Sequence, residues 1–242
     1  MKGKLIIVDG LDGSGKGVCV TAIKEYLESI GKRIFDLNEY WKTCNNIPES
    51  EEVKEYDAII SSEPTYGLIG KVIRDEIIRV NSHGRSYSAL STAHAFALDR
   101  EILYTKLIIP ILKKGMIVVQ ERGVVTSLVY QPVQHEKIDL STVMSLPGNR
   151  LALQYPPDLL IITKVQPEVV IKRLELREKK DYAIFENLIF QRKIEERYES
   201  EWLKRLFEQR GTKVVYLDTN PPDSVEDTKR KSIEIFREFL GQ

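Results

Sequence analysis

The chain has 242 residues, of which 42% are hydrophobic, and its 36 lysines and arginines balance 36 aspartates and glutamates. This composition predicts one folded α/β domain, residues 1–242, with a substantial core, and it excludes a disordered chain. Because the formal net charge is zero, nothing overall favours binding to nucleic acid, and any anion site must be local.

Cysteine and histidine usage argues against a disulfide framework or a structural metal site. Cys19 and Cys44 suit neither, which favours a reducing compartment, and we expect a cytoplasmic protein. His83, His94 and His135 lack the spacing of metal ligands and are expected on the surface or in packing. The chain begins with a strand, and no run of 18 apolar residues occurs, so neither an export signal nor a membrane span is expected.

The first elements of the chain predict a phosphate site. A buried strand at residues 4–9 is followed by the pattern G-x-x-x-x-G-K at residues 10–16, and then by a helix at residues 16–29. A strand before and a helix after the glycines favour a nucleotide triphosphate site over a purely structural turn, because backbone N–H groups, Lys16 and the helix N-terminus can all face phosphate. The expected phosphate ligands are Gly10, Asp12, Gly13, Ser14, Gly15, Lys16, Gly17 and Val18.

Extended segments and helical patterns alternate along the rest of the chain. Further strands are predicted at residues 33–37, 57–61, 116–120, 158–164 and 214–217, and helices at residues 66–80, 88–114, 167–178, 184–209 and 224–240. Pro110 is expected to bend the long helix, and the polar stretch 38–56 to be an insertion or loop. The alternation predicts a parallel sheet with helices on both faces and ligands at the carboxyl ends of the strands.

Polar residues follow three of the predicted strands. Asp9 and Asp12 follow the first, Glu63 another, and Glu121-Arg122 a third. Phosphoryl transfer requires alignment of two substrates and neutralisation of charge, which magnesium, lysine and arginine provide. Any one of these charges could be an ordinary surface group. Arg122, directly after an apolar strand, and Arg100, in an alanine-rich helix, nevertheless favour bidentate phosphate binding.

The chain resembles the thymidylate kinases, a family of P-loop nucleoside monophosphate kinases, over nearly its whole length. The matching motifs are residues 6–16, Glu63-Pro64-Thr65 with 69–74, Phe96-Ala97-Leu98-Asp99-Arg100 with 108–110, Glu121-Arg122 with 127–131, Pro157-Asp158-Leu159, Asp181 with Phe185, and Arg197-Tyr198. The resemblance implies a three-layer P-loop kinase fold, a parallel β-sheet flanked by helices on both faces, with a small helical lid at about residues 176–186.

The resemblance also implies roles for individual residues. Phe96 would stack on the acceptor base, and Tyr130 would disfavour ribose, with plain core packing as the alternative for both rings. The implied acceptor-binding residues are Asp12, Glu63, Arg74, Phe96, Arg100, Arg122, Ser127, Tyr130 and Gln131, with the three arginines holding the monophosphate. The implied catalytic residues are Lys16, Asp12, Arg122 and Glu121. Magnesium would bind Asp9, Asp12 and Glu121, partly through water.

The chain departs from the family pattern at several positions. Gly17 stands where a hydroxyl residue commonly holds magnesium, and Gly123 replaces an aromatic residue after Glu121-Arg122. Tyr182 follows Asp181, where a lid arginine is usual, and Ser62 replaces the usual arginine before Glu63. The lid cation would then come from Arg173, Arg177, Lys179 or Lys180, although helix-surface charge is an equally good interpretation of these four residues.

The leading hypothesis is transfer of the ATP γ-phosphoryl group to dTMP, giving dTDP, with Mg²⁺ as cofactor and ATP as co-substrate. Small nucleotides are the expected partners, with no nucleic acid and no membrane, and the resemblance implies a homodimer. Two alternatives remain open. One is a kinase for another deoxynucleotide or nucleoside. The other is a nucleotide-binding homologue with impaired catalysis, which the altered Gly17, Gly123 and Tyr182 motivate.

Overall fold

A computed structural model describes residues 3–78, 87–134, 136–175 and 188–241. Its strands form a six-stranded sheet in the order β2-β3-β4-β1-β5-β6, and every neighbouring pair is parallel. The strands are β1 (Lys4–Gly10), β2 (Ile34–Asp36), β3 (Ala58–Ser62), β4 (Ile117–Glu121), β5 (Leu159–Lys164) and β6 (Lys213–Asp218). The predicted parallel α/β sheet is therefore confirmed.

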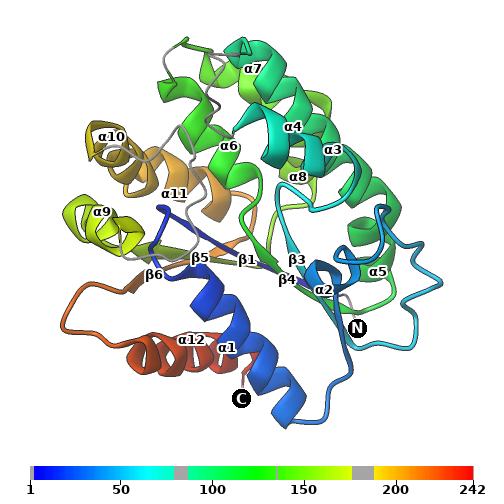
Figure 1. Ribbon diagram of the computed structural model, residues 1–242. Helices are drawn as coiled ribbons and strands as arrows, with labels where there is room; N and C mark the ends of the chain where they lie inside the picture. Colours follow the sequence, from blue (N-terminus) through cyan, green and yellow to red (C-terminus); the bar gives the residue numbers. More distant parts are fainter. Residues whose placement is uncertain (1–2, 79–86, 135, 176–187, 242) are drawn as a thin grey trace.

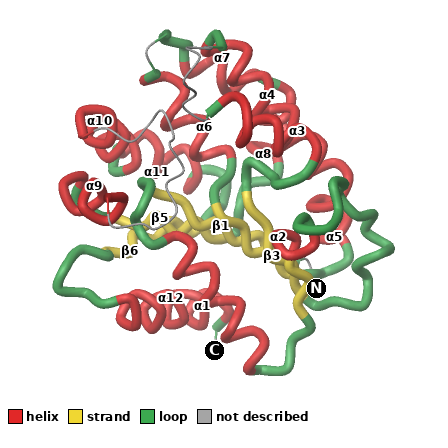
Figure 2. Tube along the Cα trace, in the orientation of Figure 1, coloured by secondary structure: helices red, strands yellow, loops and turns green. Residues whose placement is uncertain are grey.

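The sheet separates two hydrophobic clusters. Figures 1 and 2 show the helices that lie above and below the sheet. Because successive side chains of a strand point to opposite faces, Leu5 and Ile7 of β1 enter one cluster and Ile6 and Val8 the other. Helices α1 (Lys16–Ser29) and α12 (Val225–Leu240) cover the face of Ile6 and Val8. The other helices pack on the opposite face.

These other helices include several that the sequence patterns did not separate. They are α2 (Leu37–Tyr40), α3 (Leu68–Val72), α4 (Ala89–Leu103), α5 (Ile109–Lys113), α6 (Val124–Tyr130), α7 (Leu140–Ser145), α8 (Pro147–Gln154), α9 (Pro167–Glu175), α10 (Leu188–Tyr198) and α11 (Glu201–Glu208). Helices α6 to α8 lie between two predicted strands where no helix was expected. Short π-helical turns occupy Ile73–Ile77 and Tyr104–Ile108, and a 3₁₀ turn occupies Gln131–Val133.

Two predicted long helices differ from the structure. The helix predicted at residues 88–114 widens into the π turn before Pro110, because proline has no N–H to continue the α-helical ladder. The helix predicted at 184–209 is two helices within the described residues, since Ser200 adopts an extended conformation with ψ of 140° and caps α11. The stretch 38–56, expected to be an insertion or loop, contains most of α2 and contributes buried Trp41 to the core.

Some predicted features lie outside the described residues. The lid at 176–186, together with Arg177, Lys179, Lys180 and Tyr182, is among them, as are His83 and His135. Within the described ranges, no helix has both the length and the apolar character needed to cross a membrane.

Candidate active site

The glycine-rich loop joins the carboxyl end of β1 to the N-terminus of α1. Gly13 and Gly15 have φ angles of +76° and +90°, in the left-handed region that other residues rarely adopt. Gly15 is also the N-cap of α1, so the positive end of the helix lies at the loop. The loop is thus built for close approach of an anion to backbone N–H groups, as the sequence motif predicts.

Lys16 is buried in this loop, with 4% of its surface exposed. Its ammonium group donates a 2.6 Å hydrogen bond to the Leu11 carbonyl. Burial, assisted by the nearby positive charge of Arg122, lowers the pKa of Lys16 to about 8, while Asp12 and Glu121 act in the opposite direction. A phosphate ligand would supply the negative charge that this ammonium group lacks in the protein alone.

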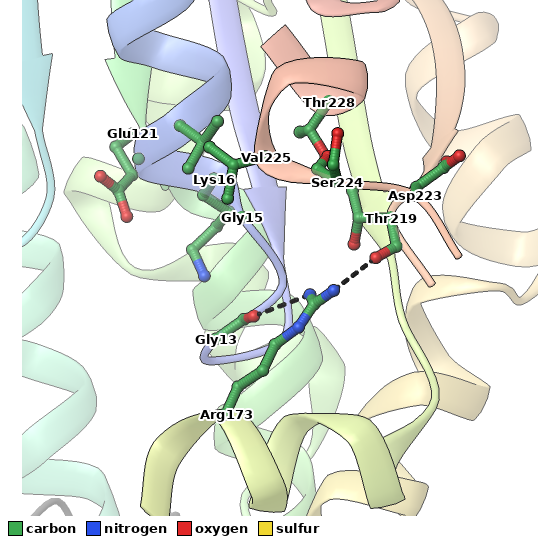
Figure 3. A pocket seen from close by; sticks show the side chains of 12 residues that line it. Gly13, Gly15, Lys16, Glu121, Arg173, Thr219, Asp223, Ser224, Val225 and Thr228 are labelled. Atoms are coloured by element: carbon green, nitrogen blue, oxygen red, sulfur yellow. Dashed lines mark hydrogen bonds between the residues drawn. The ribbon is translucent and has the colours of Figure 1, made fainter. Parts of the chain in front are cut away.

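A pocket with a volume of about 370 Å³ opens beside the loop (Figure 3). It brings together the loop, the end of β4, helix α9, and the segment 219–228, which connects β6 to α12 and includes the first turn of α12. The lining residues are Gly13, Gly15, Lys16, Gly17, Val18, Glu121, Arg173, Thr219, Asp223, Ser224, Val225 and Thr228. The pocket therefore extends from the predicted phosphate ligands to a part of the chain that the sequence patterns did not single out.

Arg173 connects two walls of this pocket. Its Nη1 donates to the Gly13 carbonyl at 3.3 Å and its Nη2 to the Thr219 carbonyl at 2.6 Å (Figure 3). Thr219 in turn donates its hydroxyl to the Ser14 carbonyl at 3.0 Å. Of the four cations proposed for the lid, Arg173 is the one that the structure describes, and it lies at the pocket on α9 rather than in the segment 176–186.

Glu121 and Gly17 face each other in the same pocket. A Cβ atom built on Gly17 would lie 3.6 Å from Oε2 of Glu121, which is an ordinary van der Waals distance. The Glu121 side chain makes no hydrogen bond or ion pair with the residues that the structure describes. Its carboxylate therefore lies beside the place that a side chain at residue 17 would occupy, and a carboxylate oxygen is a suitable ligand for magnesium.

Asp9, predicted as a magnesium ligand, has a different environment. It is fully buried, and its carboxylate accepts hydrogen bonds from the Gly10 N–H (2.9 Å), the Thr126 N–H (3.1 Å) and hydroxyl (2.8 Å), and the Tyr198 hydroxyl (2.7 Å). These donors occupy both oxygens, so the contacts do not fit a direct metal ligand. Among the described residues no three acidic, histidine or cysteine side chains gather into a metal-binding group.

Arg122, Asp12 and Tyr130 meet at the carboxyl ends of β1 and β4. Arg122 is hydrogen-bonded to Asp12, and the Tyr130 hydroxyl donates to the other oxygen of Asp12 at 3.2 Å. Burial lowers the pKa of Arg122, but the surrounding carboxylates and tyrosines, Asp12 first among them, outweigh burial and raise it well above its usual value. Arg122 also has a φ of +64°, a conformation that costs about 1–3 kcal/mol for a non-glycine residue and is concentrated at functional sites.

Arg100 and Glu63, both predicted to contact the acceptor, form a buried ion pair instead. Their side chains are 1% and 3% exposed, and Arg100 Nη2 lies 2.6 Å from Glu63 Oε2. The guanidinium also binds the Asn149 side chain and the Ser127 hydroxyl. Burial raises the pKa of Glu63 to about 7 despite the opposing charge of Arg100. Protein groups thus bind both terminal nitrogens of Arg100, while its Nε is buried without a partner among the described residues, and its predicted role as a phosphate ligand stays a prediction.

The remaining predicted acceptor residues surround this pair. Ser127 accepts hydrogen bonds from Arg100 and, at 3.3 Å, from Gln131, whose Oε1 is buried without a partner among the described residues. Phe96 is half-buried on α4 and belongs to neither core cluster, so core packing does not account for its ring. Arg74 lies 3.7 Å above the ring of Tyr66.

Comparison with known proteins identifies the family. The thymidylate kinase family model matches residues 42–231. The chain is 28% identical to a thymidylate kinase of Clostridium novyi over 224 residues, covering 91% of this chain and 93% of that protein. It is 28% identical to the Caldicellulosiruptor saccharolyticus thymidylate kinase over 194 residues, 80% of each chain.

The chain belongs to the thymidylate kinase family. Its fold agrees with two solved thymidylate kinases. The structure from Ehrlichia chaffeensis superimposes with a TM-score of 0.63 at 19% identity, over 98% of this chain and 100% of that one. The structure from Candida albicans gives 0.65 at 16% identity, over 98% and 92%. The predicted family, P-loop kinase fold and phosphotransferase class are thereby confirmed.

A family departure at Gly123 has a steric explanation. A Cβ atom at this position would lie 3.0 Å from Cδ1 of Ile7 and 3.4 Å from Nε2 of Gln120. The aromatic residue usual in thymidylate kinases would therefore displace a core side chain of β1 in this chain.

Sequence reasoning missed the pocket wall at residues 219–228 and the partners of Asp9, namely Thr126 and Tyr198. The wall had a usable signal. The last predicted strand ends in the polar run Asp218-Thr219-Asn220, and the rule that ligands bind at carboxyl ends of parallel strands applies to β6 as it does to β1. Tyr198 had no local signal beyond its place in a family motif, because only the fold brings α10 against β1.

Proposed function

We propose that this thymidylate kinase family member transfers the γ-phosphoryl group of ATP to dTMP, giving dTDP. The observation that carries the proposal is the arrangement at the edge of the sheet. The phosphate loop with Lys16 lines a pocket, and Asp12 of the same loop contacts the Arg122–Tyr130 cluster. Two anionic substrates meeting at such an edge would be aligned between two cations, which is the main requirement of phosphoryl transfer.

On the donor side, the loop N–H groups and Lys16 would hold the ATP phosphates. Arg173 and the segment 219–228 form the rest of that pocket and would contact the nucleoside. Lys16 would exchange the Leu11 carbonyl for phosphate oxygen, which is a better partner for a buried ammonium group.

Magnesium would be held by Glu121, with Asp12 nearby and with phosphate oxygens and water completing its shell. The fit rests on the free carboxylate of Glu121 opposite Gly17 and on the preference of Mg²⁺ for oxygen ligands. Bound there, the ion would neutralise charge on the transferring group. Asp9 is left out of this set, because its oxygens are occupied.

On the acceptor side, Arg122 and Arg74 would hold the monophosphate, and Phe96 would stack on the base. Tyr130 would lie against the sugar, and the buried Ser127 and Gln131 would line the base end of the site. Arg100 would act indirectly, by fixing Ser127 through its buried pair with Glu63. We also propose, from family membership, one kinase domain acting as a cytoplasmic homodimer.

The test is ADP formation from Mg-ATP with each of dTMP, dUMP, the other deoxy- and ribonucleoside monophosphates, and thymidine. We expect a clear preference for dTMP, and a loss of at least 100-fold in kcat for Lys16→Ala, on the scale of losing one preorganised charge contact. Lys204→Ala, a surface lysine on α11, is the matched control. Preference for another acceptor would reassign the substrate, and ATP binding without transfer to any acceptor would show impaired catalysis.

A further inference from the structure

Arg74, a proposed ligand of the acceptor phosphate, stacks on the aromatic ring of Tyr66. Its guanidinium carbon lies 3.7 Å from the centre of the Tyr66 ring, and its Nε donates to the carbonyls of Pro64 (3.0 Å) and Thr65 (3.1 Å). Burial lowers the pKa of Arg74, with Tyr66 opposing this shift and Arg122 adding to it. The stacked ring and these two carbonyls together hold the cation in place.

Tyr66 itself is held by the insertion segment 38–56. The ring of Trp41 lies 6.3 Å from that of Tyr66 and packs on the backbone of Gly67, where an added Cβ atom would come within 3.1 Å of the indole. Trp41 is 6% exposed, whereas Tyr66 is 47% exposed. The buried Trp41 ring thus helps to fix the orientation of the more exposed Tyr66 ring.

The turn that carries Tyr66 is strained, and the same segment stabilises it. Leu68 has a φ of +48°, which is uncommon for a residue with a side chain, and its N–H donates to the Asn45 side chain at 3.0 Å. The Trp41 indole N–H donates to the Asn46 carbonyl at 2.9 Å, which fixes the indole and the asparagine pair together. The strained turn therefore persists because the insertion holds it.

The insertion is in turn anchored to the body of the protein. Lys106 forms an ion pair with Glu49 at 3.0 Å, Lys114 pairs with Glu51, and the Ser62 hydroxyl donates to Asn38 at 2.7 Å. In Figure 1 the loop after α2 runs beside α5. The contacts form a continuous connection from the helices at residues 104–113 through the insertion to Tyr66 and Arg74.

We propose that Tyr66 is a positioning residue for Arg74, and that the insertion segment 38–56 fixes Tyr66 through Trp41 and Asn45. The inference rests on the proposed function in that it takes Arg74 as a ligand of the acceptor phosphate. The part that matters is the aromatic face of Tyr66. Its hydroxyl makes no hydrogen bond with a described residue.

The experiment is a double-mutant cycle on the full-length enzyme, with KM and kcat measured for dTMP and for ATP. Tyr66→Leu raises KM for dTMP about 5- to 20-fold and changes KM for ATP less than twofold, since a cation–π contact of this kind is lost only on the acceptor side. Tyr66→Phe stays close to wild type. In the Arg74→Ala background, Tyr66→Leu has no further effect, because the group that it positions is gone.

Two further variants test the support. Trp41→Leu raises KM for dTMP about threefold, and the exposed Tyr155→Leu at the end of α8 is the control for removing an aromatic ring. Thermal unfolding of every variant checks that each is folded. An unchanged KM for dTMP in Trp41→Leu would remove the insertion from the proposal.

Equal increases in KM for dTMP in Tyr66→Phe and Tyr66→Leu would mean that the hydroxyl contacts the substrate itself, and would overturn the inference. Additive effects of Tyr66→Leu and Arg74→Ala on KM for dTMP in the double mutant would overturn it as well. Failure of the proposed function looks different, because the wild-type enzyme would then prefer another acceptor than dTMP, and the cycle would be run with that acceptor.

Discussion

The lowered pKa of Lys16 predicts that ATP affinity falls with rising pH. Burial brings this pKa from 10.5 to about 8, a difference of about 3 kcal/mol between the charged and neutral forms. Below pH 8 the free protein already carries the ammonium charge that phosphate requires. Above pH 8 the free protein has lost that proton, so ATP binding must be accompanied by proton uptake, and the dissociation constant rises about tenfold per pH unit.

The expected curve is flat from pH 6.5 to 7.5 and rises through pH 8 to 10, with the dissociation constant at pH 9 about ten times that at pH 7. Cys19, Tyr130 and Tyr198 do not titrate in that range, because burial raises the pKa of Cys19 to about 12 and those of Tyr130 and Tyr198 well above 10. Glu63, whose pKa is about 7, titrates below the pH at which the predicted rise begins. The terminal phosphate of ATP, with a pKa of about 6, is almost fully ionised at pH 8 and above, where the rise is expected.

The assay is isothermal titration calorimetry with ATP at each pH, in two buffers of different ionisation enthalpy, so that proton uptake at pH 9 is counted directly. Lys16→Arg is the matched control, because a guanidinium stays charged throughout, and its weaker binding should not depend on pH. A wild-type affinity that stays constant to pH 10, with no proton uptake, would refute either the buried environment of Lys16 or its contact with phosphate.

Two further predictions concern the buried ion pair and the metal site. Glu63→Ala leaves Arg100 buried without its charged partner and should lower the free energy of unfolding, measured by urea denaturation, by about 3–5 kcal/mol. The control, Glu201→Ala, removes an exposed ion pair with Arg205 and should lower it by less than about 1 kcal/mol. Equal decreases in the two variants would contradict a stabilising role of the buried pair. Gly17→Ser places a hydroxyl beside Glu121 and should lower the Mg²⁺ concentration for half-maximal activity about fivefold relative to Gly17→Ala, a gain of roughly 1 kcal/mol. If activity depends on Mg²⁺ concentration in the same way in both variants, residue 17 is not part of the metal site.

The features that sequence could predict are those with local causes. The loop at residues 10–16 is recognisable because glycines, a preceding apolar strand and a following helix occur within one short segment. The strand positions follow from short apolar runs, and their parallel pairing follows from the helices between them. The break at Ser200 was missed, because a single capping residue inside a long helical pattern is a weak signal.

The roles of charged residues were harder to predict, because they depend on distant partners. Arg100 and Glu63 are far apart in the sequence, and nothing in either local sequence shows that their charges pair. Asp9 likewise has the position of a metal ligand, and only the fold brings the Tyr198 hydroxyl to it. A carboxylate at a strand end is equally suited to hold a metal or to hold neighbouring elements together, and its donors decide which.

Three cations of this site have partners within the protein before any substrate is bound. Lys16 donates to a loop carbonyl, Arg122 binds Asp12, and Arg74 lies on an aromatic ring. Phosphate oxygens could replace the carbonyl and carboxylate partners of Lys16 and Arg122, and the carbonyls of Pro64 and Thr65 that Arg74 binds, whereas Asp9 and Arg100 are buried with several hydrogen bonds each. In the proposed function, the residues that can exchange partners contact the substrates, and Asp9 and Arg100 keep those residues in place.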